Sequence, residues 1–196
     1  MERLPELEAC APDITAAFEI MRDCFAAGGK ALFCGNGGSA ADCEHWVGEL
    51  MKGFEKKRPL TPDAKSGLPG ALAEGLQGAL PAVPLTGFTS LSTAFANDAD
   101  PRLVFAQITW GLGRAGDVLV AISTSGNSPN VCRAIEAARA RRMKVIALTG
   151  ETGGQMAGMA DVAIKAPGAR ICRVQEYHQP IYHCISLMLE DEFFGG

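Results

Sequence analysis

The fold class of this 196-residue chain is best read from residues 117–129, DVLVAISTSGNSP. Residues 117–122 are rich in β-branched and aliphatic side chains, which is typical of a buried strand. The next six residues form a loop rich in hydroxyl groups. Ser128 followed by Pro129 is a strong signal for a helix start, with Ser128 as the N-cap. This segment therefore predicts a strand, a polar loop and a helix in succession.

The same unit recurs elsewhere in the chain. The apolar run 31–34, ALFC, leads into the glycine-rich loop 35–39, GNGGS, and then into a helical segment at about 39–51. Further strands are predicted at 144–148, at 161–164 and, as an edge strand because of its prolines, at 82–85. Strands that alternate with helices predict an α/β fold, in which helices cover both faces of a parallel sheet.

The remaining segments are two helices and one unusual insertion-like stretch. Helical apolar spacing predicts a helix over about 13–27, and a long helix over 175–193 that Pro180 should kink. Residues 61–80 are rich in Gly, Pro, Ala and Leu, and contain GLPGAL followed by the similar GLQGAL. We expect a surface excursion or a pair of short helices there, since two copies are too few for a repeat architecture.

Composition excludes several classes of protein. With 18 Lys and Arg against 22 Asp and Glu, the net charge is −4, which argues against a nucleic-acid-binding protein. No signal peptide and no apolar run of about 18 residues are found, so no membrane segment is expected. The seven cysteines are odd in number and lack a CxxC motif, as is typical of reduced thiols in a cytoplasmic protein.

The loop at 123–128 is a candidate phosphate site. It places the hydroxyl groups of Ser123, Thr124, Ser125 and Ser128 between the carboxyl end of a strand and the N-terminus of a helix. Free backbone N–H groups and the helix dipole favour an anion at such a position, although a plain capped turn would have the same composition. The loop at 35–40 matches GxGxxA, but no second strand with an acidic end follows it, which argues against a dinucleotide site.

The three histidines suggest a second site. His45 and Glu49 are four residues apart on one helical face, where they can share a Zn²⁺ ion or form a simple hydrogen bond. Gln175 and His183 lie on the last predicted helix, roughly 80° apart around its axis. His178 points away from His183 and suits a core or capping role. Spacing alone leaves both the metal and the metal-free interpretation open.

Together these motifs resemble the sugar isomerase (SIS) domain family, and most closely its phosphoheptose isomerase branch. The matching segments include CGNGGSAAD at 34–42, HxxxE at 45–49, AND at 96–98 and RVQEYH…H at 173–183. The resemblance covers about residues 13–193. It implies a single domain over 1–196, with a three-layer α/β/α fold on a five-stranded parallel sheet. It also implies a homotetramer with active sites at subunit interfaces.

The resemblance further implies an activity and a set of site residues. The family reaction converts sedoheptulose 7-phosphate to D-glycero-D-manno-heptose 7-phosphate through an enediol, for bacterial surface-polysaccharide synthesis. By motif, the phosphate would be held by Ser123, Thr124, Ser125 and Ser128, and the sugar chain contacted by Ser39, Asn97, Asp98 and Gln175. One Zn²⁺ per subunit would be bound by His45, Glu49, Gln175 and His183. Glu49 and His183 would transfer the proton, and whether Glu49 is ligand, base or both is open.

Three departures from the family pattern keep alternatives open. Cys172 stands where close members often carry Asp, and Pro180 could reorient His183. Joining Leu60 to Pro81 would give the usual family sequence, so 61–80 looks like a 20-residue insertion. The alternatives are an isomerase of another phosphosugar, or a non-catalytic SIS protein that binds a sugar phosphate or a replication-initiator partner. The presence of all four predicted ligands favours an enzyme.

Overall fold

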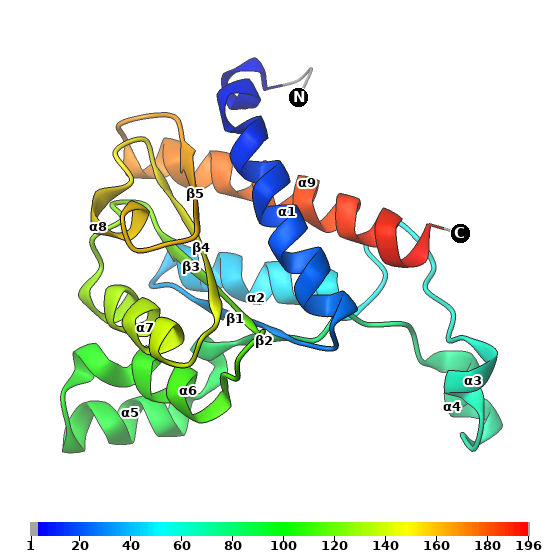
Figure 1. Ribbon diagram of the computed structural model, residues 1–196. Helices are drawn as coiled ribbons and strands as arrows, with labels where there is room; N and C mark the ends of the chain where they lie inside the picture. The colour runs from blue at the N-terminus through cyan, green and yellow to red at the C-terminus, as the bar shows by residue number, and fades with distance from the viewer. Residues whose placement is uncertain (1–3, 196) are drawn as a thin grey trace.

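The computed structural model describes residues 4–195 and contains a five-stranded parallel sheet between two layers of helices (Figure 1). The strand order is β2-β1-β3-β4-β5. The strands are β1 (Ala31–Cys34), β2 (Ala82–Pro84), β3 (Val118–Ser123), β4 (Lys144–Gly150) and β5 (Val162–Ala166). The predicted three-layer α/β/α fold is confirmed.

The central strands are apolar because they are covered on both faces. Every residue of β1 and of β3 is buried. In β1, Phe33 packs into the core on one side of the sheet and Leu32 into the core on the other. Strand β2 lies at the edge, where Pro84 is tolerated because one side of an edge strand makes no ladder hydrogen bonds.

Three long helices cover one face of the sheet. They are α1 (Ala11–Ala26), α2 (Gly38–Met51) and α9 (Ile171–Phe194), and a 3-10 helix, η1 (Pro5–Cys10), precedes α1. The helix expected from residue 13 thus begins two residues earlier, and α9 continues through Pro180. Although α9 has 24 residues, no helix within 4–195 is both long and apolar enough to cross a membrane.

Shorter helices cover the opposite face. They are α5 (Thr89–Asp98), α6 (Val104–Leu112), α7 (Pro129–Ala140) and α8 (Gly154–Ala157), with 3-10 helices η2 (Leu85–Gly87) and η3 (Pro101–Leu103). Helices α6 and α7 pack on the sheet, whereas α5 buries none of its described residues. Helix α7 begins at Pro129, as predicted, but the Ser128 side chain makes no capping hydrogen bond; its hydroxyl lies 2.9 Å from that of Ser123 instead.

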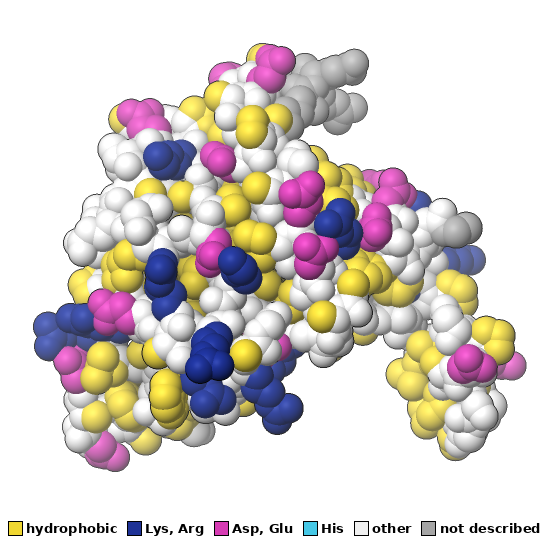
Figure 2. Space-filling model, in the orientation of Figure 1, with side chains coloured by type: hydrophobic (Ala, Val, Ile, Leu, Met, Phe, Trp, Pro, Cys, Tyr) yellow, Lys and Arg dark blue, Asp and Glu magenta, His cyan; other side chains and the backbone are white. Residues whose placement is uncertain are grey.

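Residues 61–80 form an arm that projects from the body of the molecule (Figure 1). The arm contains α3 (Pro62–Lys65) and α4 (Gly70–Gly75), and within the described chain only its last residue, Leu80, is buried. Its base is closed by an antiparallel bridge between Pro59 and Gln77, and by a 2.7 Å hydrogen bond from the Gly78 N–H to the Arg58 carbonyl. Figure 2 shows hydrophobic side chains on the surface of the arm. Two residues of the arm, Leu72 and Leu76, are about half exposed.

Candidate active site

Three predicted site residues meet between α2 and α9. The Nε2 atoms of His45 and His183 each lie 3.0 Å from Oε1 of Glu49. His45 and Glu49 are one turn apart on α2, and α9 packs beside α2 and brings in His183. Glu49 is buried, while both imidazoles are partly exposed. We call these residues the His–Glu–His cluster.

The chemistry of the cluster fits a metal ion. Its ligand atoms lie within 4.8 Å of one another, and imidazole nitrogens with a carboxylate oxygen are a common donor set for catalytic zinc. Among residues 4–195, neither carboxylate oxygen of Glu49 has a hydrogen-bond partner, and His183 Nε2 also has none. Buried polar atoms without a partner are costly, so a cation among them would stabilise the arrangement.

Burial also affects the basicity of Glu49. It raises the pKa of the Glu49 carboxyl, and the opposing charges of His183 and His45 only partly offset this effect. A carboxylate with a raised pKa is a better general base near neutral pH. Glu49 therefore has the environment expected of either a proton acceptor or a metal ligand.

Gln175, the fourth predicted ligand, lies away from the His–Glu–His cluster of its own chain. It precedes His183 by eight residues on one helix, which separates the two by about 12 Å along the axis. Its amide packs against Gly38, at the start of α2, where a Cβ atom would collide with it. A single chain thus brings together three of the four predicted ligands, and leaves Gln175 at the far end of α2.

Two charged residues hold the end of α2 that carries Glu49. The buried Arg58 guanidinium donates to the carbonyls of Glu49 and Leu50, at 2.9 and 2.8 Å, and to the carboxylate of Glu190 at 2.7 Å. Glu190 also accepts the backbone N–H groups of residues 54–56. This pair was not predicted from the sequence, because Arg and Glu that are 132 positions apart look like ordinary surface charges.

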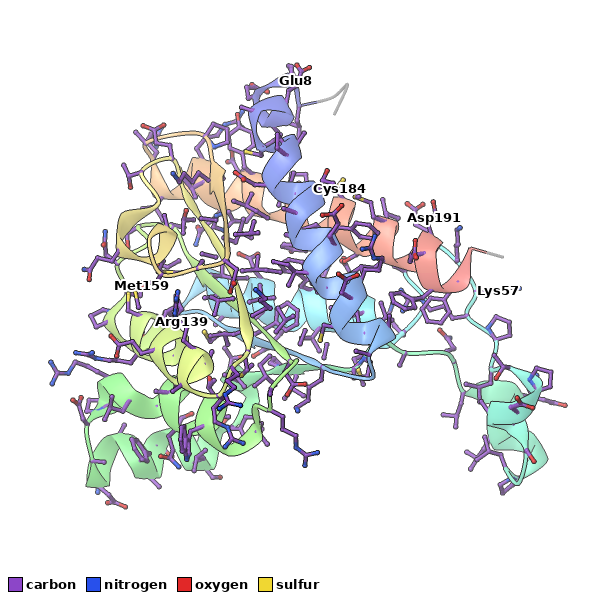
Figure 3. All side chains as sticks on the ribbon, in the orientation of Figure 1. Glu8, Lys57, Arg139, Met159, Cys184 and Asp191 are labelled. Atoms are coloured by element: carbon purple, nitrogen blue, oxygen red, sulfur yellow. The ribbon has the colours of Figure 1, made fainter. Side chains whose placement is uncertain are left out.

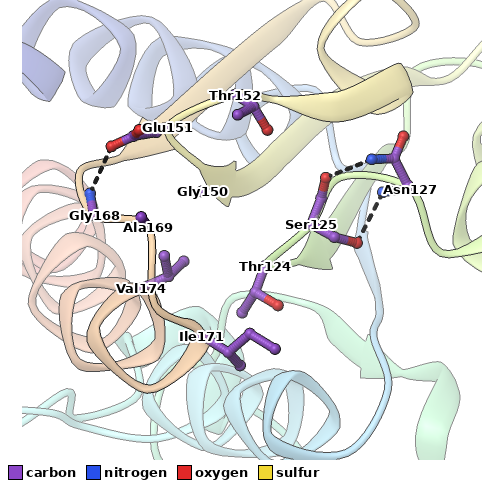
Figure 4. A pocket seen from close by; sticks show the side chains of 10 residues that line it. All are labelled: Thr124, Ser125, Asn127, Gly150, Glu151, Thr152, Gly168, Ala169, Ile171 and Val174. Carbon is purple, nitrogen blue, oxygen red and sulfur yellow. Dashed lines mark hydrogen bonds between the residues drawn. The ribbon is translucent and has the colours of Figure 1, made fainter.

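The loop of residues 123–128, which we call the hydroxyl loop, borders a cavity of about 330 Å³ (Figure 4). Thr124, Ser125 and Asn127 line one side of it, at the carboxyl end of β3. Asn127 and Ser125 bind each other, through Asn127 N–H to Ser125 Oγ at 3.2 Å and Asn127 Nδ2 to Ser125 O at 2.9 Å. Ser123 and Ser128 are paired with each other and do not line this cavity. Only Gly fits at 126, where φ is +65° and a Cβ would meet the backbone of Gly153.

The other side of this cavity comes from the loops after β4 and β5 and from the start of α9. Its lining there includes Glu151, Thr152, Gly168, Ile171 and Val174. The Glu151 carboxylate accepts the Gly168 N–H at 3.1 Å and so joins the two loops. Glu151 was not predicted as a site residue, since its place in a loop gave no sign of what it faces.

None of the remaining predicted residues belongs to the cluster or lines this cavity. Ser39 is buried at the start of α2. Asn97 and Asp98 are exposed at the end of α5, where Asn97 Nδ2 donates to Asp98 Oδ1 at 2.9 Å. His178 is fully buried, its Nε2–H donates to the Thr149 carbonyl at 3.1 Å, and burial lowers its pKa to about 4. It is the core histidine that sequence analysis offered as one possibility.

Comparison with known proteins agrees with this architecture. The family model described as the SIS domain matches residues 2–67 and 70–150. Phosphoheptose isomerase from Aromatoleum aromaticum is 46% identical over 186 residues, covering 93% of this chain and 84% of the relative. The Chromohalobacter salexigens protein of the same name is 40% identical, covering 96% and 88%.

Solved structures give the same result. Phosphoheptose isomerase GmhA from Neisseria gonorrhoeae superposes with a TM-score of 0.78 at 39% identity, covering 95% of this chain and 91% of that one. A phosphoheptose isomerase from Francisella tularensis superposes with a TM-score of 0.82 at 34% identity, covering 96% and 91%.

The parallel sheet, the hydroxyl loop and the His–Glu–His cluster define a sugar isomerase domain, and the chain is an enzyme of the phosphosugar isomerase class. Its substrate is therefore a sugar phosphate. Within that class, the chain belongs to the phosphoheptose isomerase family.

Proposed function

We propose that the enzyme converts sedoheptulose 7-phosphate to D-glycero-D-manno-heptose 7-phosphate, in the cytoplasm, for bacterial surface-polysaccharide heptose. The observation that carries this proposal is the His–Glu–His cluster, in which a buried carboxylate lies 3.0 Å from two imidazoles. Its relatives at 46% and 40% identity are named phosphoheptose isomerases, which supports a seven-carbon substrate.

The cluster suits the proton transfer that a ketose–aldose isomerisation requires. Glu49 removes the proton from C1 of the ketose, and the electrons of that bond form the C1–C2 double bond of an enediolate. His183, beside Glu49, supplies a proton to the developing oxyanion on C2. Glu49 then returns its proton to C2 while the C1 hydroxyl gives its proton back to His183, which leaves the aldehyde at C1. A buried site favours this step because the carboxylate is not stabilised by bulk water.

Metal binding is part of the proposal. His45, Glu49 and His183 would hold one Zn²⁺ ion per subunit, which when bound polarises the substrate carbonyl and stabilises the enediolate charge. The unpaired ligand atoms of Glu49 and His183 support this assignment.

The hydroxyl loop is proposed as the phosphate site. Thr124 and Ser125 line the cavity, at the carboxyl end of β3 and close to the start of α7, where backbone N–H groups and the helix dipole favour an anion. The hydrogen bond between Ser123 and Ser128 stabilises the loop, and both hydroxyl groups can reorient toward a bound phosphate. Ser39, Asn97, Asp98 and Gln175 are proposed to contact the sugar chain.

We propose that the site is completed by a second copy in a homotetramer. Gln175 lies about 12 Å along α9 from His183, so the Gln175 that joins a cluster would come from a neighbouring chain. Asn97 and Asp98, exposed on α5, can also face a neighbour. No nucleic acid or membrane partner is part of this proposal.

The test is isomerase activity on sedoheptulose 7-phosphate, before and after chelation and after zinc is added back. We expect turnover that chelation removes and zinc restores. Absence of turnover under every metal condition would contradict the proposed reaction. Assays of other phosphosugars, and of binding without turnover, would then separate a different isomerase from a sugar-phosphate-binding protein.

A further inference from the structure

We infer that Tyr182 is a positioning residue that fixes the proton and orientation of His45. The Tyr182 hydroxyl oxygen lies 2.8 Å from Nδ1 of His45. Tyr182 is 1% exposed, and its ring stacks on Trp46 with centroids 5.3 Å apart and an angle of 20° between the planes. This packing fixes the position of the hydroxyl. The His45 ring also contacts the Tyr182 ring, in an edge-to-face arrangement. The hydroxyl is therefore a fixed point against which His45 is oriented.

Asp42 determines the direction of this hydrogen bond. It lies three residues before His45 on α2, on the same helical face. Its Oδ2 atom is buried and has no hydrogen-bond partner among residues 4–195. Asp42 and the Tyr182 hydroxyl both flank His45: Asp42 is three residues away on α2, and the hydroxyl lies 2.8 Å from Nδ1. The hydroxyl proton turned toward Asp42 satisfies that oxygen.

A hydroxyl that donates to Asp42 has only its lone pairs left for His45. His45 must then carry its proton on Nδ1 and donate it to Tyr182, because a neutral imidazole has one N–H and one acceptor nitrogen. Nε2 is left as a free lone pair, and Nε2 is the atom 3.0 Å from Glu49. Asp42 and Tyr182 thus hold His45 in the tautomer that can bind a metal within the cluster.

The consequence for zinc rests on the proposed function, since it requires that the cluster binds the metal. Partners that orient a metal-binding histidine are commonly carboxylates or carbonyls, and their loss costs about 10- to 100-fold in metal affinity. In this protein the partner that orients His45 is the Tyr182 hydroxyl, which in turn is oriented by the Asp42 carboxylate.

The first test uses the only two tyrosines of the chain, which lie on the same helix. Tyr182→Phe removes the hydroxyl and keeps the ring that stacks on Trp46. Tyr177→Phe is the matched control, because the Tyr177 hydroxyl binds Arg173 at 2.7 Å, away from the cluster. Zinc titration of the metal-free proteins by calorimetry should give a dissociation constant about 10- to 100-fold weaker for Tyr182→Phe. The control should bind zinc as the wild type does.

The second test reads the tautomer without any metal. In metal-free protein labelled with ¹⁵N-histidine, long-range ¹H–¹⁵N spectra at about pH 8, well above the ordinary pKa of an imidazole, report which ring nitrogen carries the proton. We expect His45 to carry it on Nδ1 in the wild type and to lose this preference in Tyr182→Phe. Asp42→Asn is an independent variant: its amide donates to the tyrosine oxygen, turns the hydroxyl toward His45 and should move the proton to Nε2.

Wild-type tautomer and wild-type zinc affinity in Tyr182→Phe would overturn the inference. So would an unchanged tautomer in Asp42→Asn if Tyr182→Phe does not fold. If the wild type binds no zinc but both variants change the His45 tautomer, the positioning role stands and the metal proposal is what fails.

Discussion

Glu49 combines a buried position with two imidazole neighbours, and a single atom change tests its role. Glu49→Gln keeps the size of the side chain and removes the charge that accepts a proton or binds a cation. We expect kcat to fall by at least about 100-fold, the lower end of what general bases contribute. Steady-state turnover of the phosphosugar is the measurement.

Glu44→Gln is the matched control for this variant, since Glu44 is exposed on the same helix and accepts a 2.9 Å hydrogen bond from Thr86. It should retain near wild-type turnover. Near-full activity in Glu49→Gln would show that neither the proposed base nor the proposed ligand is needed.

His178 gives the fold a dependence on pH. Its pKa is lowered to about 4 by burial, whereas an unfolded histidine titrates at about 6.5. Between these values the unfolded chain binds a proton that the folded chain does not, so stability falls as the pH drops from about 6.5 toward 4. The full contribution is about 3 kcal/mol.

Denaturant unfolding at about pH 7 and about pH 4.5 measures this loss, with His178→Gln as the comparison. Gln keeps an N–H donor for the Thr149 carbonyl but does not titrate. A smaller loss of stability in the variant is expected; an equal loss in both proteins would assign the acid sensitivity to other groups.

Individual site residues could be predicted from the sequence where local spacing carries the information. The His45–Glu49 pair is an i, i+4 pattern, which any helix places on one face. The approach of His183, and the separation of Gln175 from it, depend on how α9 packs along α2. The contact between Tyr182 and His45 depends on the same packing, so it left no sign in the sequence.

Among helices and strands, apolar runs bounded by glycine gave the most reliable predictions. Strand β1 has the predicted limits of 31–34, and β3 begins one residue later than predicted. Helix α9 begins at Ile171, four residues before the predicted 175–193, and of these four residues only Val174 is buried. Contacts that tie one element to another, such as Arg58 with Glu190, require the folded chain and were missed.

The Arg58–Glu190 pair should be the most sensitive link between α2 and α9. In Glu190→Gln the buried guanidinium loses its charged partner, and removal of one partner of a buried pair costs about 3–5 kcal/mol. The free energy of unfolding from denaturant titration measures this cost. We also expect Glu49 to be less well held, because Arg58 donates to its carbonyl.

The neighbouring residue provides the control. Asp191, near the end of α9 (Figure 3), pairs with Lys56 and is 72% exposed. An exposed pair contributes less than about 1 kcal/mol, so Asp191→Asn should unfold almost as the wild type does. Equal losses in the two variants would mean that the buried pair has no special role.

The molecule as a whole exposes apolar groups that one chain does not cover. Trp110 is 53% exposed, and Ile171, which lines the cavity beside residues 124–127, is 66% exposed. Such groups are common at contacts between subunits. They agree with the proposed homotetramer, whose mass by light scattering should be four times that of one chain.

Mixed oligomers test where the Gln175 of each site comes from. Gln175→Ala and His183→Ala should each be inactive alone. After the two are unfolded together and refolded as mixed oligomers, a site with the cluster of one chain and the Gln175 of the other is complete, and activity should return. No recovery, despite mixing shown by native mass spectrometry, would contradict a shared site.

The arm of residues 61–80 has a consequence for how this chain can change over generations. Its two ends meet at Pro59 and Gln77, so residues between them can be gained or lost while α2 and β2 keep their positions. Because almost none of its side chains enters the core, mutations there escape the packing constraints that act on the sheet. The arm is therefore the part of the gene with the most freedom to vary in length, and a natural place for a lineage to acquire a new contact without loss of catalysis.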